Sequence, residues 1–236
     1  MKTTVSVVIP TYNERDNIRK LLNRISAAME KAGVGYEIVV VDDNSPDGTG
    51  EVVKKIASKT HTRLIARRAK LGIGSAYKEG VESTRGRIVV TMDADFSHDP
   101  SIIPLMVEEI GKGNDIVIGS RYVKGGAIDK WSIYRRIMSR TAGLFAKLVL
   151  GLKTNDLTTG YRAYTRDALR IIKFDELTSS GYSILMEVVF RAERAGLSIK
   201  EVPITFHDRE GGSSKLGFSE QLKYALTVIR LRLRRY

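Results

Sequence analysis

The short run Asp93-Ala94-Asp95 is the part of the sequence best suited to chemistry. Two carboxylates separated by one residue can bind the same divalent cation, and Mg²⁺ and Mn²⁺ both prefer oxygen ligands and share them with substrate phosphates. The run directly follows an apolar stretch at 87–92 that predicts a buried strand. An isolated Asp-x-Asp more often forms a turn or caps a helix. Here other carboxylates follow neighbouring strands, so metal binding is the favoured interpretation.

Polar clusters also follow three other predicted strands. These clusters are Thr11-Tyr12-Asn13-Glu14, Asp42-Asp43-Asn44 and Ser120-Arg121. The carboxyl ends of parallel strands meet at one edge of a sheet, and ligands of such sheets bind at that edge. We therefore expect all of these clusters to converge with the two aspartates on one site.

Each cluster also has a purely structural interpretation. Tyr12 and Glu14 suit stacking on a base and binding a hydroxyl, but the segment equally suits a helix start with Asn13 as N-cap. Adjacent side chains on a strand point to opposite faces, so at most one of Asp42 and Asp43 is expected to face a ligand. Asp43 suits hydrogen bonds to a base or ribose, and an Asx turn is the competing interpretation.

Basic residues that suit phosphate binding fall into three groups. Arg121 follows a predicted strand, and Arg135 begins an otherwise apolar helix. Arg209 and Lys215 flank a glycine- and serine-rich stretch at 211–214. The planar fork of Arg matches phosphate, and a basic glycine-rich loop can close over an anion. A single Arg usually lies on a solvated surface. For Arg209 and Lys215 the favoured interpretation is a mobile loop that closes over the bound anion.

The apolar pattern behind these clusters alternates between strands and helices. Strands are predicted at 5–10, 36–41, 63–66, 87–92, 115–120 and 199–206. Helices are predicted at 14–32, 49–58, 72–84, 100–111, 132–150, 181–195 and 218–235. This alternation predicts an α/β fold, with a mostly parallel, Rossmann-like sheet and helices on both faces. We expect one domain over 1–217 and a helical appendage over 218–236.

The last predicted helix is basic and amphipathic. Its apolar stripe consists of Phe218, Leu222, Ala225, Ile229, Leu233 and Tyr236. No acidic residue follows Glu220, whereas Lys and Arg are frequent. Such a helix suits an anionic membrane surface. Packing of the stripe on the domain is an equally good interpretation.

Composition excludes several function classes. The 236 residues contain 39 Lys and Arg against 27 Asp and Glu, a net charge of +12, which indicates an anionic partner. Cysteine is absent, so there is no disulfide, thiolate zinc site or Cys nucleophile, and a histidine zinc site would use all 3 His. No stretch approaches the roughly 20 apolar residues of a membrane-spanning helix, and we expect no signal peptide before the first strand. A nucleic-acid-binding module would explain the charge but not the strand-end carboxylates, so no nucleic-acid partner is expected.

Four segments, in order, resemble the family 2 glycosyltransferases with the GT-A fold. They are 8–14 (VIPTYNE), 40–49 (VVDDNSPDGT), 92–98 (MDADFSH) and 119–126 (GSRYVKGG). Later segments narrow the resemblance to the dolichol-phosphate (polyprenol-phosphate) mannose synthases. They are Trp131 with Arg135, 156–162 (DLTTGYR), Gly181-Tyr182 with Met186-Glu187, 201–204 (EVPI) and 214–216 (SKL). The resemblance covers nearly the whole chain.

The resemblance implies a role for each site residue. The residues implied to bind the donor are Pro10, Tyr12, Glu14, Val41, Asp43, Asp93, Ala94, Asp95, Arg209 and Lys215. The residues implied to hold Mg²⁺ or Mn²⁺ are Asp93, Asp95 and Ser97, the last at a position where some members have Gln. The residues implied to bind the acceptor phosphate are Arg121, Arg135 and Ser183. Asp95 and Arg121 are the implied catalytic pair.

The implied reaction is the inverting transfer of mannose from GDP-mannose to dolichyl or polyprenyl phosphate. The alternative is a family 2 enzyme that uses UDP-glucose or another nucleotide sugar, with polyprenyl phosphate or a glycan as acceptor. Many members of the resembled family carry transmembrane helices after the catalytic domain. Here the basic tail helix, or a small membrane-anchoring subunit, is expected to hold the chain at the cytoplasmic face of a membrane.

Overall fold

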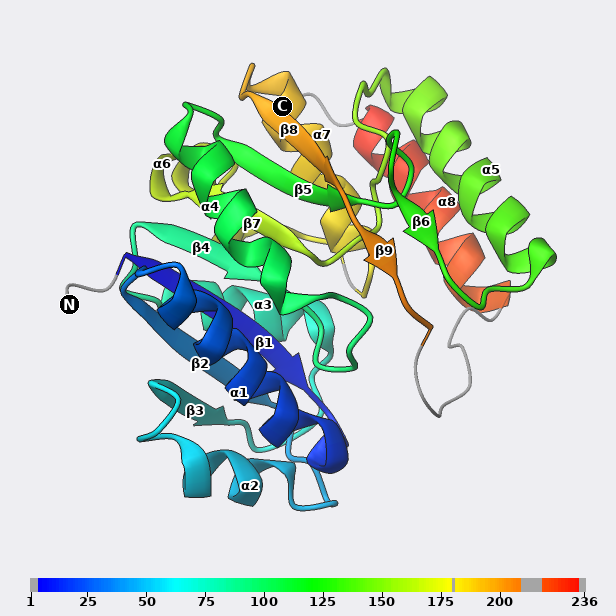
Figure 1. Ribbon diagram of the computed structural model, residues 1–236. Coiled ribbons are helices and arrows are strands. Elements are labelled where there is room, and N and C mark those ends of the chain that lie inside the picture. Colours follow the sequence, from blue (N-terminus) through cyan, green and yellow to red (C-terminus); the bar gives the residue numbers. More distant parts are fainter. Residues whose placement is uncertain (1–3, 180, 209–217, 234–236) are drawn as a thin grey trace.

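The computed structural model of the chain describes residues 4–179, 181–208 and 218–233 (Figure 1). Its strands are β1 (Val5–Thr11), β2 (Tyr36–Asp42), β3 (Thr62–Ala66), β4 (Ile88–Thr91), β5 (Ile116–Ser120), β6 (Ala127–Ile128), β7 (Arg162–Thr165), β8 (Ile199–Pro203) and β9 (Thr205–Phe206). Its α-helices are α1 (Arg15–Lys31), α2 (Thr49–Ile56), α3 (Ile73–Glu82), α4 (Ile103–Gly111), α5 (Ile133–Leu150), α6 (Arg166–Ile171), α7 (Ser183–Arg194) and α8 (Phe218–Leu233). Two 3-10 turns, η1 (Pro100–Ile102) and η2 (Phe174–Glu176), complete the described elements.

Seven strands form the central sheet, in the order β3-β2-β1-β4-β7-β5-β8. Every neighbouring pair is parallel except the two pairs that involve β7. The mostly parallel sheet predicted from the sequence is therefore confirmed. Because β1, β2, β4 and β5 run in the same direction, their carboxyl ends meet at one edge, toward which their arrowheads point in Figure 1.

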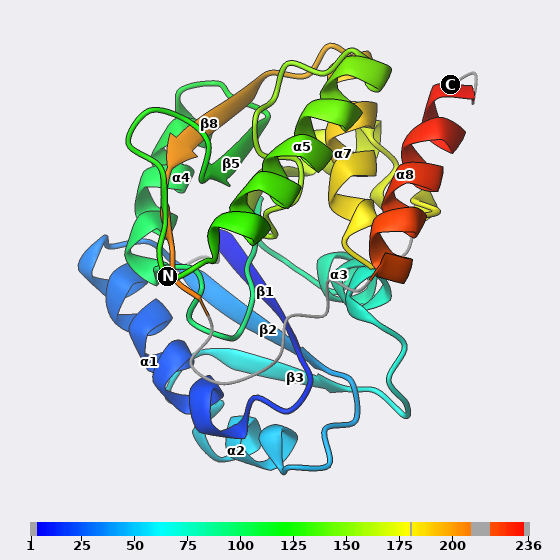
Figure 2. The ribbon, with the colours of Figure 1, turned by 90° about the vertical axis from the view of Figure 1, so that its right-hand side faces the viewer.

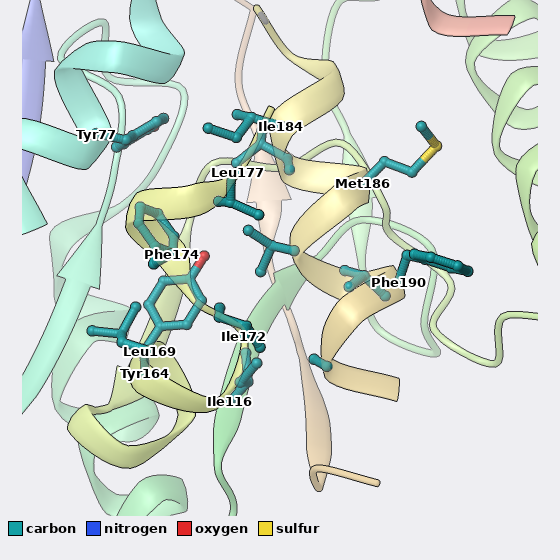
Figure 3. Packing of buried hydrophobic residues seen from close by; sticks show 14 of the residues in the cluster. Tyr77, Ile116, Tyr164, Leu169, Ile172, Phe174, Leu177, Ile184, Met186 and Phe190 are labelled. Atoms are coloured by element: carbon teal, nitrogen blue, oxygen red, sulfur yellow. The ribbon is translucent and has the colours of Figure 1, made fainter. Parts of the chain in front are cut away.

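Helices cover both faces of the sheet, and β2 shows how its sequence builds both layers. Ile38 and Val40 pack in the apolar cluster that contains residues of α1, α2 and α4. Val39 and Val41 pack in the cluster that contains residues of α3, α5, α7 and α8. Figure 3 shows part of the second cluster, to which α3 contributes Tyr77. A strand buried on both faces needs apolar residues at every position, which explains its continuous apolar run.

The strand β7 and the helix α6 were not predicted. β7 has four residues and begins with Arg162, whose charge argues against a buried strand. In the structure the Arg162 side chain is fully buried, and its guanidinium donates hydrogen bonds to the carbonyl oxygens of Leu157, Thr159 and Leu185. These carbonyls replace the water that the charge would otherwise need. A polar loop precedes β7.

The single strand predicted at 199–206 is two strands in the structure. β8 pairs with β5 in the central sheet and ends at Pro203. After Ile204 the chain leaves that sheet, and β9 pairs with β6 in a separate two-stranded sheet. The change of partner brings Phe206, His207 and Asp208 toward the edge of the sheet that carries the predicted site.

The predicted tail helix is present as α8, but its packing residues differ from the predicted stripe. Val228 and Leu231 are buried in the cluster shared with α5 and α7. Leu222, Ile229 and Leu233, all from the predicted stripe, are exposed. The helix therefore packs on the domain beside α5 and α7 (Figure 2), and apolar side chains on its other side are exposed. Among the described residues no helix has the length and hydrophobicity that crossing a membrane requires.

Candidate functional site

Asp93 and Asp95 lie in the loop that follows β4, at the edge where the parallel strands end. Oδ1 of Asp93 accepts a hydrogen bond of 2.9 Å from the Tyr77 hydroxyl. Oδ1 of Asp95 accepts hydrogen bonds from the backbone N–H of Ser97 at 3.1 Å and from the Ser97 hydroxyl at 2.5 Å. The protein therefore orients both carboxylates by itself.

This pair of carboxylates fits a divalent metal that is shared with a phosphate substrate. Within residues 4–179, 181–208 and 218–233, no group of three or more His, Asp or Glu side chains is placed to hold a metal ion alone. Mg²⁺ commonly takes one or two protein carboxylates together with substrate phosphates, and Asp93 and Asp95 match that pattern. Ser97 lies beside Asp95, as its predicted role requires, whereas the Ala94 side chain packs in the apolar core.

Tyr12, in the segment after β1, forms a cation–π contact with Lys70. The ammonium of Lys70 lies 3.6 Å from the centre of the Tyr12 ring. The helix start differs from the prediction, because Glu14 and not Asn13 occupies the N-cap position of α1. Asn13 has a positive φ of 60°, and its backbone N–H donates to the Ser45 hydroxyl. Position 13 is thus a turn residue, for which Asn is well suited.

The two aspartates at the end of β2, Asp42 as its last residue and Asp43 directly after it, have different partners, as the strand geometry predicted. Asp42 accepts hydrogen bonds from the side chains of Thr11 and Ser45 and so stabilises the turn. Asp43 accepts a hydrogen bond from the backbone N–H of Gly72 at 2.9 Å and lies 2.7 Å from the Arg67 guanidinium. The predicted donor-binding carboxylate is therefore already part of a buried cluster, which ties β2 to the loop at 67–72.

Pro10 and Val41 are neighbours across β1 and β2. Pro10 is half-buried near the end of β1, whereas the Val41 side chain is fully buried. A Cβ added to Gly80 of α3 would lie 3.0 Å from a Val41 methyl group, so this valine supports the packing of α3 on the sheet. A contact between Val41 and a donor would have to use its main chain.

Arg121 follows β5 and is almost fully buried against Asp156. Its Nε and Nη2 each donate a hydrogen bond of 2.7 Å to one carboxylate oxygen of Asp156, and its backbone N–H donates to the same group at 3.1 Å. Nη2 also donates to the Thr158 hydroxyl. Burial by itself would raise the pKa of the Asp156 carboxyl. The Arg121 guanidinium and the backbone donors lower this pKa by more than burial raises it, so the carboxyl stays ionised. The pair is a charged, bidentate contact inside the protein.

Arg135 and Arg121 both lie near the aromatic ring of Trp131. The Arg135 guanidinium carbon is 4.0 Å from the centre of the Trp131 ring, and that of Arg121 is 5.5 Å from it. Arg135 also forms an ion pair of 2.9 Å with Asp208, just after β9. Phe206 packs on Trp131 and lies 5.2 Å from the Arg121 guanidinium. The structure thus brings together two of the three predicted acceptor-phosphate residues.

The third predicted acceptor residue comes from α7. Ser183 is buried at the start of α7, where Ile184 packs against Gly74 of α3. In the part of the chain that the structure describes, no hydrogen bond joins Ser183 to Arg121 or Arg135. Arg209 and Lys215, predicted to bind the donor, lie outside the described residues.

His98 is a packing histidine in the loop after β4. It is buried and stacks on the Tyr161 ring, with 4.9 Å between ring centres. Its Nδ1 accepts a hydrogen bond of 3.3 Å from the backbone N–H of Asp93. Burial lowers the pKa of His98, which favours the neutral ring.

Several residues that support the site are not among the residues predicted from the sequence. Tyr77 and Asp156 hold the acidic and the basic side chains, and Lys70 covers Tyr12. Asp156 belongs to a segment that had already carried the family resemblance, which was a usable signal. Tyr77 sits in an ordinary apolar helix pattern, so nothing in the sequence distinguishes it from other core residues.

A protein family model decides the classification. The model of Glycosyl transferase family 2 matches residues 6–172, which include the ends of β1, β2, β4 and β5 and the Arg121–Asp156 pair. The chain belongs to glycosyl transferase family 2. The family and the fold predicted from the four motifs are therefore confirmed.

Two relatives extend this finding over more of the chain. Dolichol-phosphate mannosyltransferase of Pyrococcus furiosus is 39% identical over 227 residues, which cover 96% of this chain and 63% of that protein. Polyprenol monophosphomannose synthase of Mycolicibacterium smegmatis is 39% identical over 218 residues, which cover 90% of this chain and 81% of that protein. The chain thus spans about two thirds to four fifths of the length of these family members.

A solved structure supports the fold independently. Glucosyl-3-phosphoglycerate synthase from Mycobacterium tuberculosis superposes with a TM-score of 0.72 at 22% identity, covering 100% of this chain and 82% of that one. At this identity the similarity is one of fold.

Proposed function

We propose that this family 2 member transfers mannose from GDP-mannose to dolichyl or polyprenyl phosphate, with inversion at the anomeric carbon. The observation that carries the proposal is the meeting of opposite charges at one sheet edge, Asp93 and Asp95 after β4 and Arg121 beside Arg135. Carboxylates suit a metal–diphosphate donor, and arginines suit a phosphate acceptor. The names of the two relatives that are 39% identical support the lipid phosphate and the mannose.

The chemistry needs little from the protein besides positioning. A phosphate monoester is anionic at neutral pH, so an oxygen of the acceptor attacks the anomeric carbon without a general base. The bond from that carbon to the diphosphate breaks, and its electron pair leaves with GDP. Arg121 and Arg135 hold the attacking phosphate and offset its repulsion from the donor. The Asp156 carboxylate already holds the Arg121 guanidinium in a fixed orientation before the acceptor binds.

Asp93 and Asp95, with Ser97, are the residues proposed to hold Mg²⁺ or Mn²⁺. When bound, such an ion neutralises charge on the leaving diphosphate. A crystal structure of the fold relative from Mycobacterium tuberculosis contains Mg²⁺ and UDP, which supports a divalent cofactor for this fold. Tyr12, Glu14, Asp43 and the main chain near Pro10 and Val41 are proposed to bind the nucleoside.

An exposed apolar face on α5 and α8 supports a membrane location. We call it the α5–α8 face, and its members are Ile133, Tyr134, Ile137, Leu144, Phe145, Leu148, Leu222, Leu226, Ile229 and Leu233. The two helices pack side by side (Figure 2). Arg140, Lys223 and Arg232 on the same helices are exposed. Apolar and basic side chains together suit the surface of an anionic bilayer.

The position of this face suits a lipid substrate. Arg135 lies in the first turn of α5, so the proposed acceptor-phosphate residues border the α5–α8 face. A polyprenyl chain in the bilayer would then present its phosphate at the site. A peripheral position on the cytoplasmic side, with or without a small anchoring subunit, is part of this proposal.

Transfer of radiolabel tests the proposal. The chain is incubated in detergent with polyprenyl phosphate and labelled GDP-mannose, with Mg²⁺, Mn²⁺ or EDTA, and UDP-glucose serves as the parallel donor. We expect metal-dependent label in the lipid phase from GDP-mannose alone. Label from UDP-glucose alone would overturn the donor assignment and favour the alternative family 2 reaction. No lipid label from either donor would overturn the lipid acceptor.

A further inference from the structure

We propose that Tyr77 is a positioning residue, whose buried hydroxyl holds the Asp93 carboxylate in the orientation that binds the divalent metal. The inference rests on the proposed function, because it takes Asp93 to be a metal ligand. It adds a residue from α3, an element that none of the predicted site residues belongs to.

The geometry of the contact is specific. The Tyr77 hydroxyl donates to Oδ1 of Asp93 over 2.9 Å, and the tyrosine side chain is 1% exposed. The ring belongs to the apolar cluster between α3, α7 and the sheet (Figure 3). A ring packed on all sides cannot turn its hydroxyl away, so the donor stays in place whether or not a ligand is bound. Hydrogen bonds of this kind orient metal-binding carboxylates, and their loss commonly weakens metal binding by about 10- to 100-fold.

Gly160 shows that the fold leaves room for this contact. A Cβ at position 160 would lie 2.5 Å from the Tyr77 hydroxyl oxygen and 3.2 Å from Oδ1 of Asp93. The φ of Gly160 lies outside the left-handed region, so the backbone alone does not require glycine there. The Gly160 carbonyl is held by a hydrogen bond from the Thr91 hydroxyl, at the end of β4. Close approach of the backbone to the Tyr77–Asp93 pair is therefore the reason for a glycine.

The same short segment supports both charged halves of the site. Asp156 orients Arg121, and Gly160, four residues later, packs against the Tyr77–Asp93 contact. The segment 156–160 therefore needs a carboxylate at position 156 and a glycine at position 160. A structural tyrosine that merely satisfies its own hydroxyl would predict lost stability without lost metal affinity, which is the distinction to be measured.

The test measures metal affinity directly, without sugar transfer. Mn²⁺ binding to the purified chain is followed in the presence of GDP by the electron paramagnetic resonance signal of free Mn²⁺. For Tyr77→Phe we expect a loss of affinity of about 10- to 100-fold. Tyr161→Phe is the matched control: Tyr161 is equally buried, but its hydroxyl donates to the backbone oxygen of Asp99, so its Mn²⁺ affinity should stay near that of the unmodified chain.

A second variant keeps the tyrosine. Gly160→Ala should lower Mn²⁺ affinity because its methyl group displaces the Tyr77 hydroxyl, whereas Gly111→Ala, with no atom within 4 Å of the added Cβ, should not. Unchanged affinity in folded Tyr77→Phe, or an equal loss in Tyr161→Phe, would overturn the inference. If Tyr77→Phe does not fold, unchanged affinity in Gly160→Ala would overturn the inference in its place. Absence of Mn²⁺ binding to the unmodified chain with GDP would instead refute the metal site itself, and the inference with it.

Discussion

Arg121 and Asp156 form a buried, bidentate ion pair across 35 residues of sequence. Their side chains are 5% and 0% exposed. Asp156 also accepts hydrogen bonds from the backbone N–H groups of Thr158 and Thr159, so its charge is well compensated. The arginine is therefore held in one orientation at the edge of the sheet, and this has consequences for stability as well as activity.

Replacing Arg121 by Ala should destabilise the fold. Removing one partner of a buried pair leaves the other charge uncompensated and typically costs about 3–5 kcal/mol. Urea unfolding monitored by circular dichroism measures the loss. The double variant Arg121→Met with Asp156→Leu should recover much of it, because no charge is then left buried. A single variant as stable as the unmodified chain would contradict the burial of this pair.

The same pair predicts how stability depends on pH. The pKa of Asp156 is lowered in the folded chain, because the effect of Arg121 and the backbone donors exceeds that of burial. A depressed carboxyl pKa contributes stability that is complete above the unfolded value, near 3.8, and is lost as pH falls through the lower folded value. The difference in unfolding free energy between the unmodified chain and Asp156→Asn should therefore be constant above about pH 5 and shrink below pH 4. A difference that shrinks already between pH 7 and 5 would contradict this assignment.

Asp95 should be required for metal-dependent transfer. Asp95→Ala removes a carboxylate ligand, and we expect mannose transfer and Mn²⁺ binding to fall to background. Asp99→Ala is the control in the same loop, because Asp99 is exposed and caps η1 through the Ser101 N–H. Activity and metal binding should survive in the control. Full activity in Asp95→Ala would remove this residue from the site.

Tyr12 should contribute to nucleotide binding by stacking. Base–aromatic stacking is worth about 1–3 kcal/mol, so Tyr12→Leu should weaken GDP binding by roughly 5- to 150-fold in calorimetry. Lys70 now covers the ring at 3.6 Å, so a bound base must displace or share its ammonium. Tyr36→Leu is a suitable control, because Tyr36 lies at the opposite end of β2 and packs on His61. Equal affinity for GDP in Tyr12→Leu would place the base elsewhere.

The α5–α8 face should bind anionic vesicles. Replacing Leu144, Leu148, Leu226 and Ile229 by Ser should sharply reduce cosedimentation with vesicles that contain phosphatidylserine, because apolar area available to the bilayer is lost. Leu105→Ser on α4 removes a partly exposed leucine from the other helical layer and should leave binding unchanged. Undiminished binding of the fourfold variant would exclude this face as the contact.

Local patterns in the sequence determined most of the sheet and its helices. Continuous apolar runs in β1, β2, β4 and β5 predict buried parallel strands, because a strand covered on both faces needs apolar residues throughout. The polar clusters directly after these runs also predicted the site, since parallel strands must end at one edge. The family resemblance added roles that no spacing could supply.

Tertiary structure decided the contacts that join distant segments. Arg162 as a buried strand residue, Asp156 as the partner of Arg121, and Tyr77 as the donor to Asp93 each depend on atoms far away in sequence. The face of α8 that packs on the domain was decided in the same way, by Val228 and Leu231 and not by the apolar stripe. A helix pattern states which side is apolar, but α8 is apolar on two sides, and only the neighbouring α5 and α7 determine which one is buried.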